Sequence, residues 1–272
     1  MTLDTTIRLK NGIHMPTVGF GTYPMKGRDC IAAVRMALET GYRLIDTAQM
    51  YNNEEGVGEG IRTANVSREE VFLTTKLDNG SHGYGETLQA CEESLNKLGL
   101  DYIDLYLIHW PVEGLREETW KAMVKLLEDG KCRSIGVSNY TERHLQELFD
   151  AFEVHPVVNQ VEFHPFLYQR DLLSYCKEHG VVMEAYSPLA KGRRLDNDVV
   201  RKIAEAHGKE PAQVVLRWEL QHGVVPIPKA SSETHIQGNF DVFDFTLTDD
   251  QMAAIDCLHT GERCDWDPSG VK

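Results

Sequence analysis

The chain has 272 residues, and its 42 acidic side chains outnumber the 28 basic ones, which gives a formal net charge of −14. An acidic surface repels phosphate backbones, so this charge argues against a general nucleic-acid-binding protein. Hydrophobic residues make up 42% of the chain and charged residues 26%, a balance that excludes extended disorder and is ample for a folded core.

Cysteine usage and apolar runs bear on the compartment. The six cysteines are spread over the whole length and none forms a C-x-x-C pair, which favours reduced thiols over a disulfide framework. The first residues, Met-Thr-Leu-Asp, do not open a signal peptide, and no run reaches the ~18 apolar residues of a membrane span. We therefore expect a cytoplasmic protein.

The predicted elements begin with a hairpin, because Asn11-Gly12 stands between two short alternating runs and is typical of a type I′ turn. Short, nearly continuous apolar segments rich in Val, Ile and Leu follow, as in strands buried on both faces. These strands are predicted at residues 17–20, 42–46, 71–76, 102–109, 134–138, 157–162, 181–186 and 224–227.

Amphipathic stretches with helical spacing separate the strands. They cover residues 30–40, 87–98, 119–129, 145–149 and 172–176. Glycines stand where helices should end before the next strand, at Gly41, Gly99, Gly130 and Gly180. A capping box, Thr248-Asp-Asp-Gln251, predicts the start of a last helix.

Repeated strand–helix units predict an α/β fold with parallel strands. Two architectures are built this way, an open doubly wound sheet and a closed (β/α)8 barrel, the TIM barrel. Eight units in about 250 residues match the barrel. Gly56-Val-Gly58-Glu-Gly60 lacks the dinucleotide fingerprint and is interpreted as a glycine-rich helix start. We predict a single barrel domain over residues 1–272, with the hairpin as a plug at its N-terminal end.

Polar residues recur where the predicted strands end. Asp46, Lys76 and His109 end three neighbouring strands, and Tyr51 lies just beyond the first. Because side chains alternate along a strand, the first three would converge on the barrel axis at the C-terminal face, where barrels carry their active sites. The structural alternative is a buried ion pair beside a hydrogen-bonded histidine.

These four side chains suit proton donation to a carbonyl oxygen. A phenol has a pKa near 10, and a neighbouring ammonium stabilises the phenolate and lowers that pKa. We predict that Asp46 keeps Lys76 charged, that Lys76 activates Tyr51 as general acid, and that His109 binds the oxygen. Reduction also needs a hydride, which no side chain delivers, so a nicotinamide cofactor is implied.

Eight motifs in order along nearly the whole chain carry a family resemblance. They are Gly-Phe-Gly-Thr-Tyr (19–23), Leu-Ile-Asp-Thr-Ala-Gln-Met-Tyr-Asn-Asn-Glu (44–54), Thr-Thr-Lys-Leu (74–77), Asp-Leu-Tyr-Leu-Ile-His-Trp-Pro (104–111), Ile-Gly-Val-Ser-Asn-Tyr (135–140), Asn-Gln-Val-Glu-Phe-His-Pro (159–165), Ala-Tyr-Ser-Pro-Leu (185–189) and Pro-Ile-Pro-Lys-Ala (226–230). The chain resembles the aldo-keto reductase superfamily, and within it the prokaryotic branch that includes 2,5-diketo-D-gluconate and methylglyoxal reductases.

The resemblance implies NADPH-dependent reduction of small aldehydes, dicarbonyls and keto-sugars, with the tetrad Asp46, Tyr51, Lys76 and His109. It implies cofactor contacts at Gly21, Thr22, Asp46, Ser138, Asn139, Gln160, Tyr186, Ser187, Leu189, Ile227, Lys229, Ser231, Ser232, His235 and Asn239. Within this set Ser138, Asn139 and Gln160 would hold the carboxamide, and Tyr186 would stack on the nicotinamide. The substrate pocket would take Tyr23, Tyr51, His109 and Trp110, with Met50, Asn52 and Trp266 near its mouth.

Two positions depart from the family's pattern. Ala230 follows Lys229 where serine is usual, and His235 stands where arginine is usual. Arginine is a fixed bidentate cation, whereas histidine is largely neutral at pH 7. We expect NADPH to be preferred through Lys229, by a smaller margin over NADH than is usual in the family, so that NADH also serves.

Other functions stay open from the residues alone. Glu162 and Glu184 would suit the acid/base pair of a barrel glycoside hydrolase, although interior hydrogen bonds explain them as well. A nicotinamide-binding redox sensor would need the cofactor site without turnover. No metal is expected, and His155 and His164 are predicted at the surface or rim. The expected partner is a small carbonyl compound, with no nucleic acid, membrane or obligate protein partner.

Overall fold

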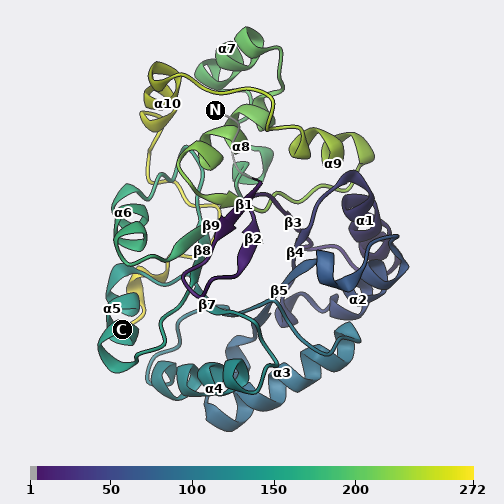
Figure 1. Cartoon of the computed structure of the whole chain (residues 1–272). Coiled ribbons are helices and arrows are strands. Elements are labelled where there is room, and N and C mark those ends of the chain that lie inside the picture. The colour runs from purple at the N-terminus through teal and green to yellow at the C-terminus, as the bar shows by residue number, and fades with distance from the viewer. Residues whose placement is uncertain (1–4) are drawn as a thin grey trace.

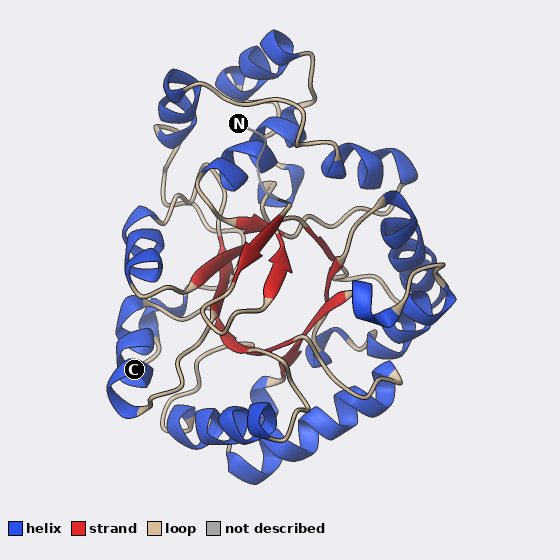
Figure 2. Ribbon diagram, viewed as in Figure 1, coloured by secondary structure: helices blue, strands red, loops and turns tan. Residues whose placement is uncertain are grey.

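Residues 5–272 are described by a computed structural model in which eight parallel strands form one sheet. The strands are β3 (Gly19–Gly21), β4 (Leu44–Asp46), β5 (Phe72–Leu77), β6 (Leu105–Ile108), β7 (Ile135–Ser138), β8 (Val158–Glu162), β9 (Val182–Tyr186) and β10 (Val225–Pro226). They pair in chain order, and the N–H of Gly21 donates to the carbonyl of Pro228 at 3.1 Å, which joins the two edges (Figure 2). The predicted barrel is confirmed.

Helices surround the strands on the outside of the barrel (Figures 1 and 2). They are α1 (Gly27–Thr40), α2 (Glu54–Thr63), α3 (Tyr84–Leu98), α4 (Arg116–Glu128), α5 (Glu142–Ala151), α6 (Arg170–Glu178), α7 (Asp198–His207), α8 (Pro211–Gln221), α9 (Glu233–Phe240) and α10 (Asp249–Asp256). Two of them, α7 and α8, share the connection from β9 to β10. In the described part of the chain every helix is too short or too polar to cross a lipid bilayer.

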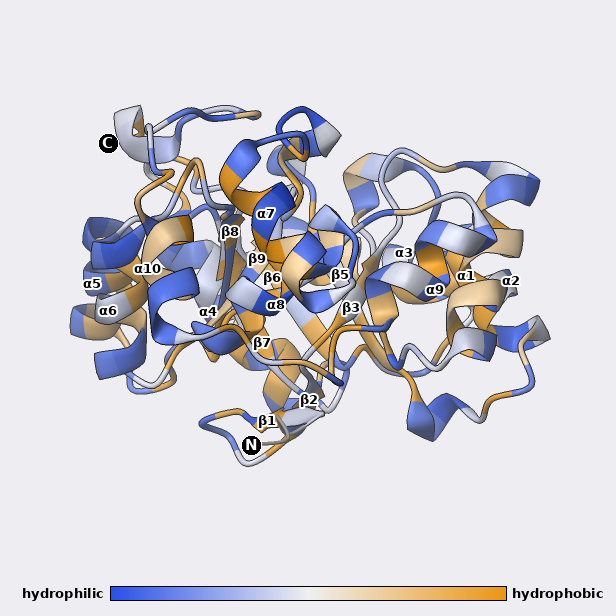
Figure 3. Ribbon diagram, turned by 90° about the horizontal axis from the view of Figure 1, so that it is seen from above, coloured by the Kyte–Doolittle hydropathy of each residue, from blue (hydrophilic) through white to orange (hydrophobic). Residues whose placement is uncertain are grey.

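The N-terminal hairpin closes the end of the barrel at which the strands begin. Its strands β1 (Thr6–Arg8) and β2 (His14–Pro16) pair antiparallel, and they lie at the opposite end from the C-terminus (Figure 3). Leu9 and Met15 are buried against Leu44, Phe72 and Leu105, which open three strands. The plug that the sequence predicted is therefore present and is held by apolar contacts.

The turn of this hairpin differs from the predicted type I′ turn. Gly12 has a φ of 89°, whereas Asn11 stays at negative φ. The N–H of Leu9 donates to the carbonyl of Ile13 at 2.8 Å, so the turn spans residues 10–12. A three-residue loop needs positive φ only at its last position, which glycine supplies.

Alternation along the strands separates an apolar end of the barrel interior from a polar end. Phe72, Leu105 and Leu107 pack in the interior together with the plug. Lys76 follows on the same face of β5, and His109 on the same face beyond β6, at the end remote from the plug. The hairpin thus seals one end while the titratable groups gather at the other.

The glycine-rich segment 56–60 lies within α2, as interpreted from the sequence. A Cβ on Gly58 would stand 2.0 Å from the backbone oxygen of Leu98, and one on Gly60 would stand 2.8 Å from Cβ of Val34. These glycines let α2 approach α3 and α1 closely, so they serve helix packing.

Replacing Gly58 with alanine should lower the free energy of unfolding by at least ~2 kcal/mol, because the new methyl group displaces a main-chain carbonyl. Urea unfolding followed by circular dichroism measures this. Gly85→Ala in the first turn of α3 is the matched control, because no heavy atom lies within 4 Å of its Cβ position. Equal stability of both variants would contradict the packing role of Gly58.

Candidate active site

A cavity of about 800 Å³ opens where the barrel strands end. Its walls come from the ends of several strands and from the loops that follow them, including Tyr51, His109, Tyr186 and Lys229. Parallel strands point all their carboxyl ends to one side, so residues distant in sequence meet there.

A buried ion pair forms the floor of the cavity. Lys76 Nζ lies 2.6 Å from Asp46 Oδ1, and their side chains are 0% and 3% exposed. The ammonium also donates to the carbonyl of Thr47 at 2.9 Å and to Tyr51 Oη at 3.4 Å. An ammonium has three protons and no acceptor. Tyr51 must therefore accept from Lys76, and its own proton is left to point elsewhere.

The charge of Lys76 is maintained against its burial. Burial lowers the pKa of Lys76, but the opposing effects of Asp46 and Tyr51 are together larger. The net pKa of Lys76 therefore lies above the ordinary value. Burial raises the pKa of Asp46, with Lys76 and Gln160 opposing that effect. The ammonium is thus a permanent positive charge beneath Tyr51.

The acidity of Tyr51 differs from the sequence-based expectation. We predicted that Lys76 would bring the phenol's pKa down, but burial raises it and Asp46 adds to that effect, so the net pKa lies above 10. The charge of Lys76 does lower the pKa of Tyr51, but this effect is smaller than that of burial. Tyr51 therefore holds its proton throughout the neutral range.

His109 lies beside Tyr51 as a neutral imidazole. The two ring centroids are 5.6 Å apart, edge to face. Burial, and after it the charge of Lys76, holds the pKa of His109 well below its ordinary value. A neutral imidazole donates a hydrogen bond from one nitrogen but lacks the acidic proton of an imidazolium ion. His109 can hold an oxygen, while Tyr51 has the transferable proton.

Gln160 connects the ion pair to a second buried carboxyl group. Its Nε2 donates to Asp46 Oδ2 at 2.8 Å and to Glu184 Oε2 at 2.6 Å. Burial, followed by the charge of Asp46, raises the pKa of Glu184 to about 8. Both amide protons of Gln160 are thus occupied, which leaves its Oε1 as an acceptor.

The cavity wall also carries a second fixed aromatic ring, that of Tyr186. Tyr186 Oη donates to Asn139 Oδ1 at 2.8 Å, and Asn139 Nδ2 donates to the carbonyl of His109 at 3.0 Å. Tyr186 and Asn139 both line the cavity. A flat ring held by its hydroxyl offers a stacking surface for a planar ligand.

The far end of the cavity combines a cation with a helix start. Lys229, His235 and Asn239 line it, and Ser232 caps α9 by accepting from the N–H of His235 at 3.3 Å. Within residues 5–272, Lys229 forms no ion pair. A lone ammonium near free N–H groups of a helix start suits a phosphate.

Comparison with known proteins agrees with this geometry. The model of the aldo/keto reductase family matches residues 17–259. The chain belongs to the aldo/keto reductase family. It is 52% identical to glyoxal reductase from Bacillus subtilis, over 96% of this chain and 95% of the relative. It is 46% identical to methylglyoxal reductase DkgA from Escherichia coli, over 98% of each. The solved aldo-keto reductase of Bombyx mori in complex with NADP matches it with a TM-score of 0.90 and 37% identity, over 97% and 95% of the chains.

The cavity of this aldo/keto reductase brings together most of the residues that the sequence predicted. Asp46, Tyr51 and His109 line it, and Lys76 lies directly beneath. The lining positions implied for the cofactor are Gly21, Thr22, Asp46, Asn139, Gln160, Tyr186, Ser187, Leu189, Ile227, Lys229, His235 and Asn239.

Three predicted cofactor positions do not line this cavity. Ser138 is buried and donates to the carbonyl of Gln160 at 2.8 Å. Ser231 lines a neighbouring hollow of about 610 Å³ between α1 and Lys229. The hydroxyl of Ser232 caps α9. Ser138 and Ser232 thus bond backbone groups, whereas Ser231 faces a hollow that shares Lys229 with the cavity.

The aromatic positions predicted for the substrate form one side of the mouth. Tyr23, Met50 and Trp110 line the cavity, and the Tyr23 and Tyr51 rings lie 4.9 Å apart. Trp266 packs on Trp110 with centroids 5.1 Å apart. Asn52, predicted near the mouth, does not line the cavity.

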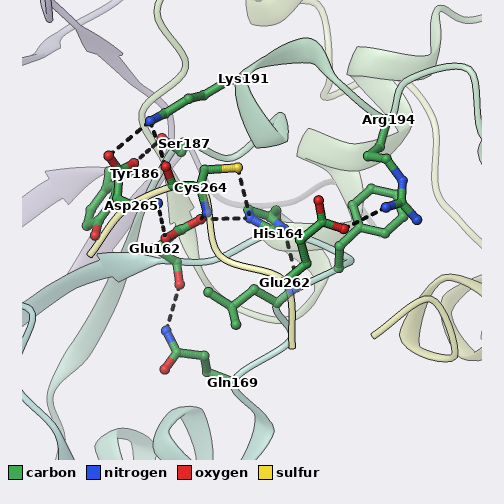
Figure 4. A network of polar contacts seen from close by, with 12 residues as sticks. Glu162, His164, Gln169, Tyr186, Ser187, Lys191, Arg194, Glu262, Cys264 and Asp265 are labelled. Carbon is green, nitrogen blue, oxygen red and sulfur yellow. Dashed lines mark hydrogen bonds and ion pairs between the residues drawn. The ribbon is translucent and has the colours of Figure 1, made fainter. Parts of the chain in front are cut away.

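Sequence reasoning missed a network that joins β8, the loop after β9 and the C-terminal segment (Figure 4). Lys191 and Asp265 line the cavity, and Glu162, His164 and Cys264 place ligand-type atoms within 4.8 Å of one another. His164 lies just beyond the end of β8, at the rim of the barrel, but it is 1% exposed and so is not a surface residue. Residues about a hundred positions apart leave no spacing pattern that would reveal this contact.

Proposed function

We propose that this aldo/keto reductase reduces aldehydes and ketones to alcohols with NADPH, and that Tyr51 is the general acid. The observation that carries the proposal is the contact of Lys76 Nζ with Tyr51 Oη at 3.4 Å. Because Lys76 can only donate, Tyr51 keeps its own proton available to a ligand oxygen in the cavity.

The residues along the cavity fit a reduced nicotinamide dinucleotide phosphate. The Tyr186 ring offers a stacking face at the end near Tyr51, and the Oε1 of Gln160 can accept from an amide such as the carboxamide. Lys229, at the start of α9, supplies the cation for a phosphate at the other end. When bound, the nicotinamide supplies the hydride.

The protein's own groups move one proton. His109 donates a hydrogen bond to the carbonyl oxygen and orients it. As negative charge develops on that oxygen, Tyr51 gives it the phenolic proton, because an alkoxide is a far stronger base than a phenolate. Lys76 then stabilises the phenolate with a charge already in place, which Asp46 maintains.

Small dicarbonyl compounds are the proposed substrates. The relatives named glyoxal reductase and methylglyoxal reductase support this class. Glu162 and Glu184 are both engaged in interior hydrogen bonds, so the hydrolase alternative has no support from their arrangement.

Absorbance of the reduced nicotinamide, with purified protein and methylglyoxal, tests the proposal. We expect both NADPH and NADH to be oxidised, with kcat/KM favouring NADPH by less than about a thousandfold, or about 4 kcal/mol. The reason is that His235 replaces a fixed cation and leaves Lys229 as the main phosphate contact. Cofactor binding without oxidation, as in a redox sensor, would refute the reductase proposal. A larger preference would refute the role of His235.

A further inference from the structure

The C-terminal segment beyond α10 is held across the mouth of the cavity by its backbone. Glu162, at the end of β8, is 1% exposed. Its Oε1 accepts a hydrogen bond from the N–H of Cys264, and its Oε2 accepts one from the N–H of Asp265 at 3.1 Å (Figure 4). One buried carboxylate therefore fixes two consecutive peptide groups.

His164 completes this anchor from behind. The N–H of Leu167 donates to His164 Nδ1 at 3.1 Å, so Nδ1 bears the lone pair and Nε2 bears the proton. Nε2 then donates to Glu162 Oε1 at 3.1 Å. Burial raises the pKa of Glu162, but these hydrogen bonds outweigh it and hold the pKa below its ordinary value. The carboxylate is ionised and fully engaged at neutral pH.

The same tail segment is tied to the cavity wall that Ser187 and Lys191 form. Lys191 donates to Asp265 Oδ1 at 2.9 Å and to the carbonyl of Cys264 at 3.0 Å. Ser187 Oγ donates to Asp265 Oδ2 at 3.4 Å. Lys191 and Ser187 line the cavity, so these contacts join the tail to the cavity wall at the loop after β9.

The residue that follows the anchored peptides is Trp266. Its ring packs on Trp110 at 5.1 Å, and Trp110 lines the cavity. Trp266 is 57% exposed, so its outer face has little packing of its own to fix it. This ring lies in a stretch of backbone that is held at Cys264 and Asp265 on one side and by Arg143 at the carbonyl of Val271 on the other, and the nearer of these two attachments is the one at Glu162.

We propose that Glu162 is a positioning residue that sets substrate specificity by holding Trp266 against Trp110. The two indole rings form an outer aromatic wall, which favours carbonyl compounds that carry an aromatic or bulky apolar group beyond the reacting carbon. Small dicarbonyls need only the inner site at Tyr51 and His109. This inference rests on the proposed reductase function. It specifies which part of the substrate the C-terminal segment contacts, namely the group beyond the reacting carbon.

The test compares two substrates that differ by one group, methylglyoxal and phenylglyoxal, in Glu162→Gln. Glutamine keeps the size of the side chain but presents an NH2 group to peptide N–H donors. We expect KM for phenylglyoxal to rise about tenfold, as for one lost charge-assisted hydrogen bond. For methylglyoxal KM should change less than about twofold, and kcat should be nearly constant for both substrates, because the proton donor is untouched.

A double-mutant cycle with Trp266→Ala decides whether Glu162 acts through this ring. In the Trp266→Ala background, Glu162→Gln should no longer change the ratio of the two KM values. Glu262→Gln is the matched control, because Glu262 lies in the same segment and, among residues 5–272, its side chain contacts only Arg194, in an exposed ion pair at 2.6 Å. An unchanged ratio in Glu162→Gln, or an undiminished effect without Trp266, would overturn the proposal.

Hydrogen exchange separates this inference from the proposed function. The amides of Cys264 and Asp265 should be protected in the wild-type protein and in Glu262→Gln, and should exchange at least about tenfold faster in Glu162→Gln. Unchanged protection in Glu162→Gln would refute the anchor whatever the activity. A wild-type protein that reduces no carbonyl compound, with these amides protected, would refute the proposed function instead.

Discussion

Tyr51→Phe should abolish nearly all carbonyl reduction while the barrel and the cofactor cavity persist. The substitution removes only the hydroxyl group, and the ring keeps its neighbours Tyr23 and His109 at 4.9 and 5.6 Å. Loss of a positioned general acid lowers the rate by about 10²–10⁴-fold. His109 cannot replace it, because its pKa lies well below neutrality and the ring carries no extra proton.

Steady-state kinetics with methylglyoxal measure this loss, and NADPH binding, followed by fluorescence quenching, should stay within about twofold of wild type. Tyr106→Phe is the matched control. Tyr106 is another buried tyrosine, and its hydroxyl has no hydrogen-bond partner among residues 5–272. That variant should keep its activity. Turnover by Tyr51→Phe within tenfold of wild type would remove Tyr51 from the role of acid.

The convergence of Asp46, Lys76 and His109 could be predicted because two simple periodicities determine it. Parallel strands carry all their carboxyl ends to one side, and alternation places every second side chain inside the barrel. The structure confirms the barrel and brings these residues together beside Tyr51. Such local rules need no knowledge of distant contacts.

Helices α7 and α8 were missed although the chain carries signals for them. Pro211 is the first residue of α8, a capping box joins Glu210 before it to Gln213 after it, and Gly208 ends α7 in a left-handed conformation. The connection from β9 to β10 contains two helices, whereas a regular barrel has one helix after each strand. The expectation of a regular repeat, rather than the chemistry of the residues, caused this omission.

Two features of the site depend on tertiary structure and could not be predicted. The pKa of Tyr51 follows from its depth of burial, which outweighs the effect of Lys76. The anchor at Glu162 uses peptide N–H groups of Cys264 and Asp265, and any residue except proline has such a group. Neither the burial of a side chain nor a hydrogen bond from a backbone N–H produces a recognisable spacing of residues in the sequence.

Lys76→Met should damage both stability and catalysis, and the two effects can be separated. Removing the cation leaves Asp46 buried without its partner, which lowers the free energy of unfolding by about 3–5 kcal/mol. Turnover should also fall steeply, because Tyr51 then has no positive charge to stabilise its phenolate. Chemical unfolding and steady-state kinetics measure the two losses.

The pH dependence of this variant has a definite sign. Without Lys76, burial raises the pKa of Asp46 in the folded state, so the folded protein binds a proton more readily than the unfolded chain. Stability then rises as pH falls, and the deficit of Lys76→Met should shrink between pH 7 and pH 5. In the double variant Asp46→Asn/Lys76→Met neither position of the former ion pair carries a charge, so stability should largely return while activity does not. A double variant as unstable as Lys76→Met would show that the packing of the Lys76 side chain, and not its charge, stabilises the floor of the cavity.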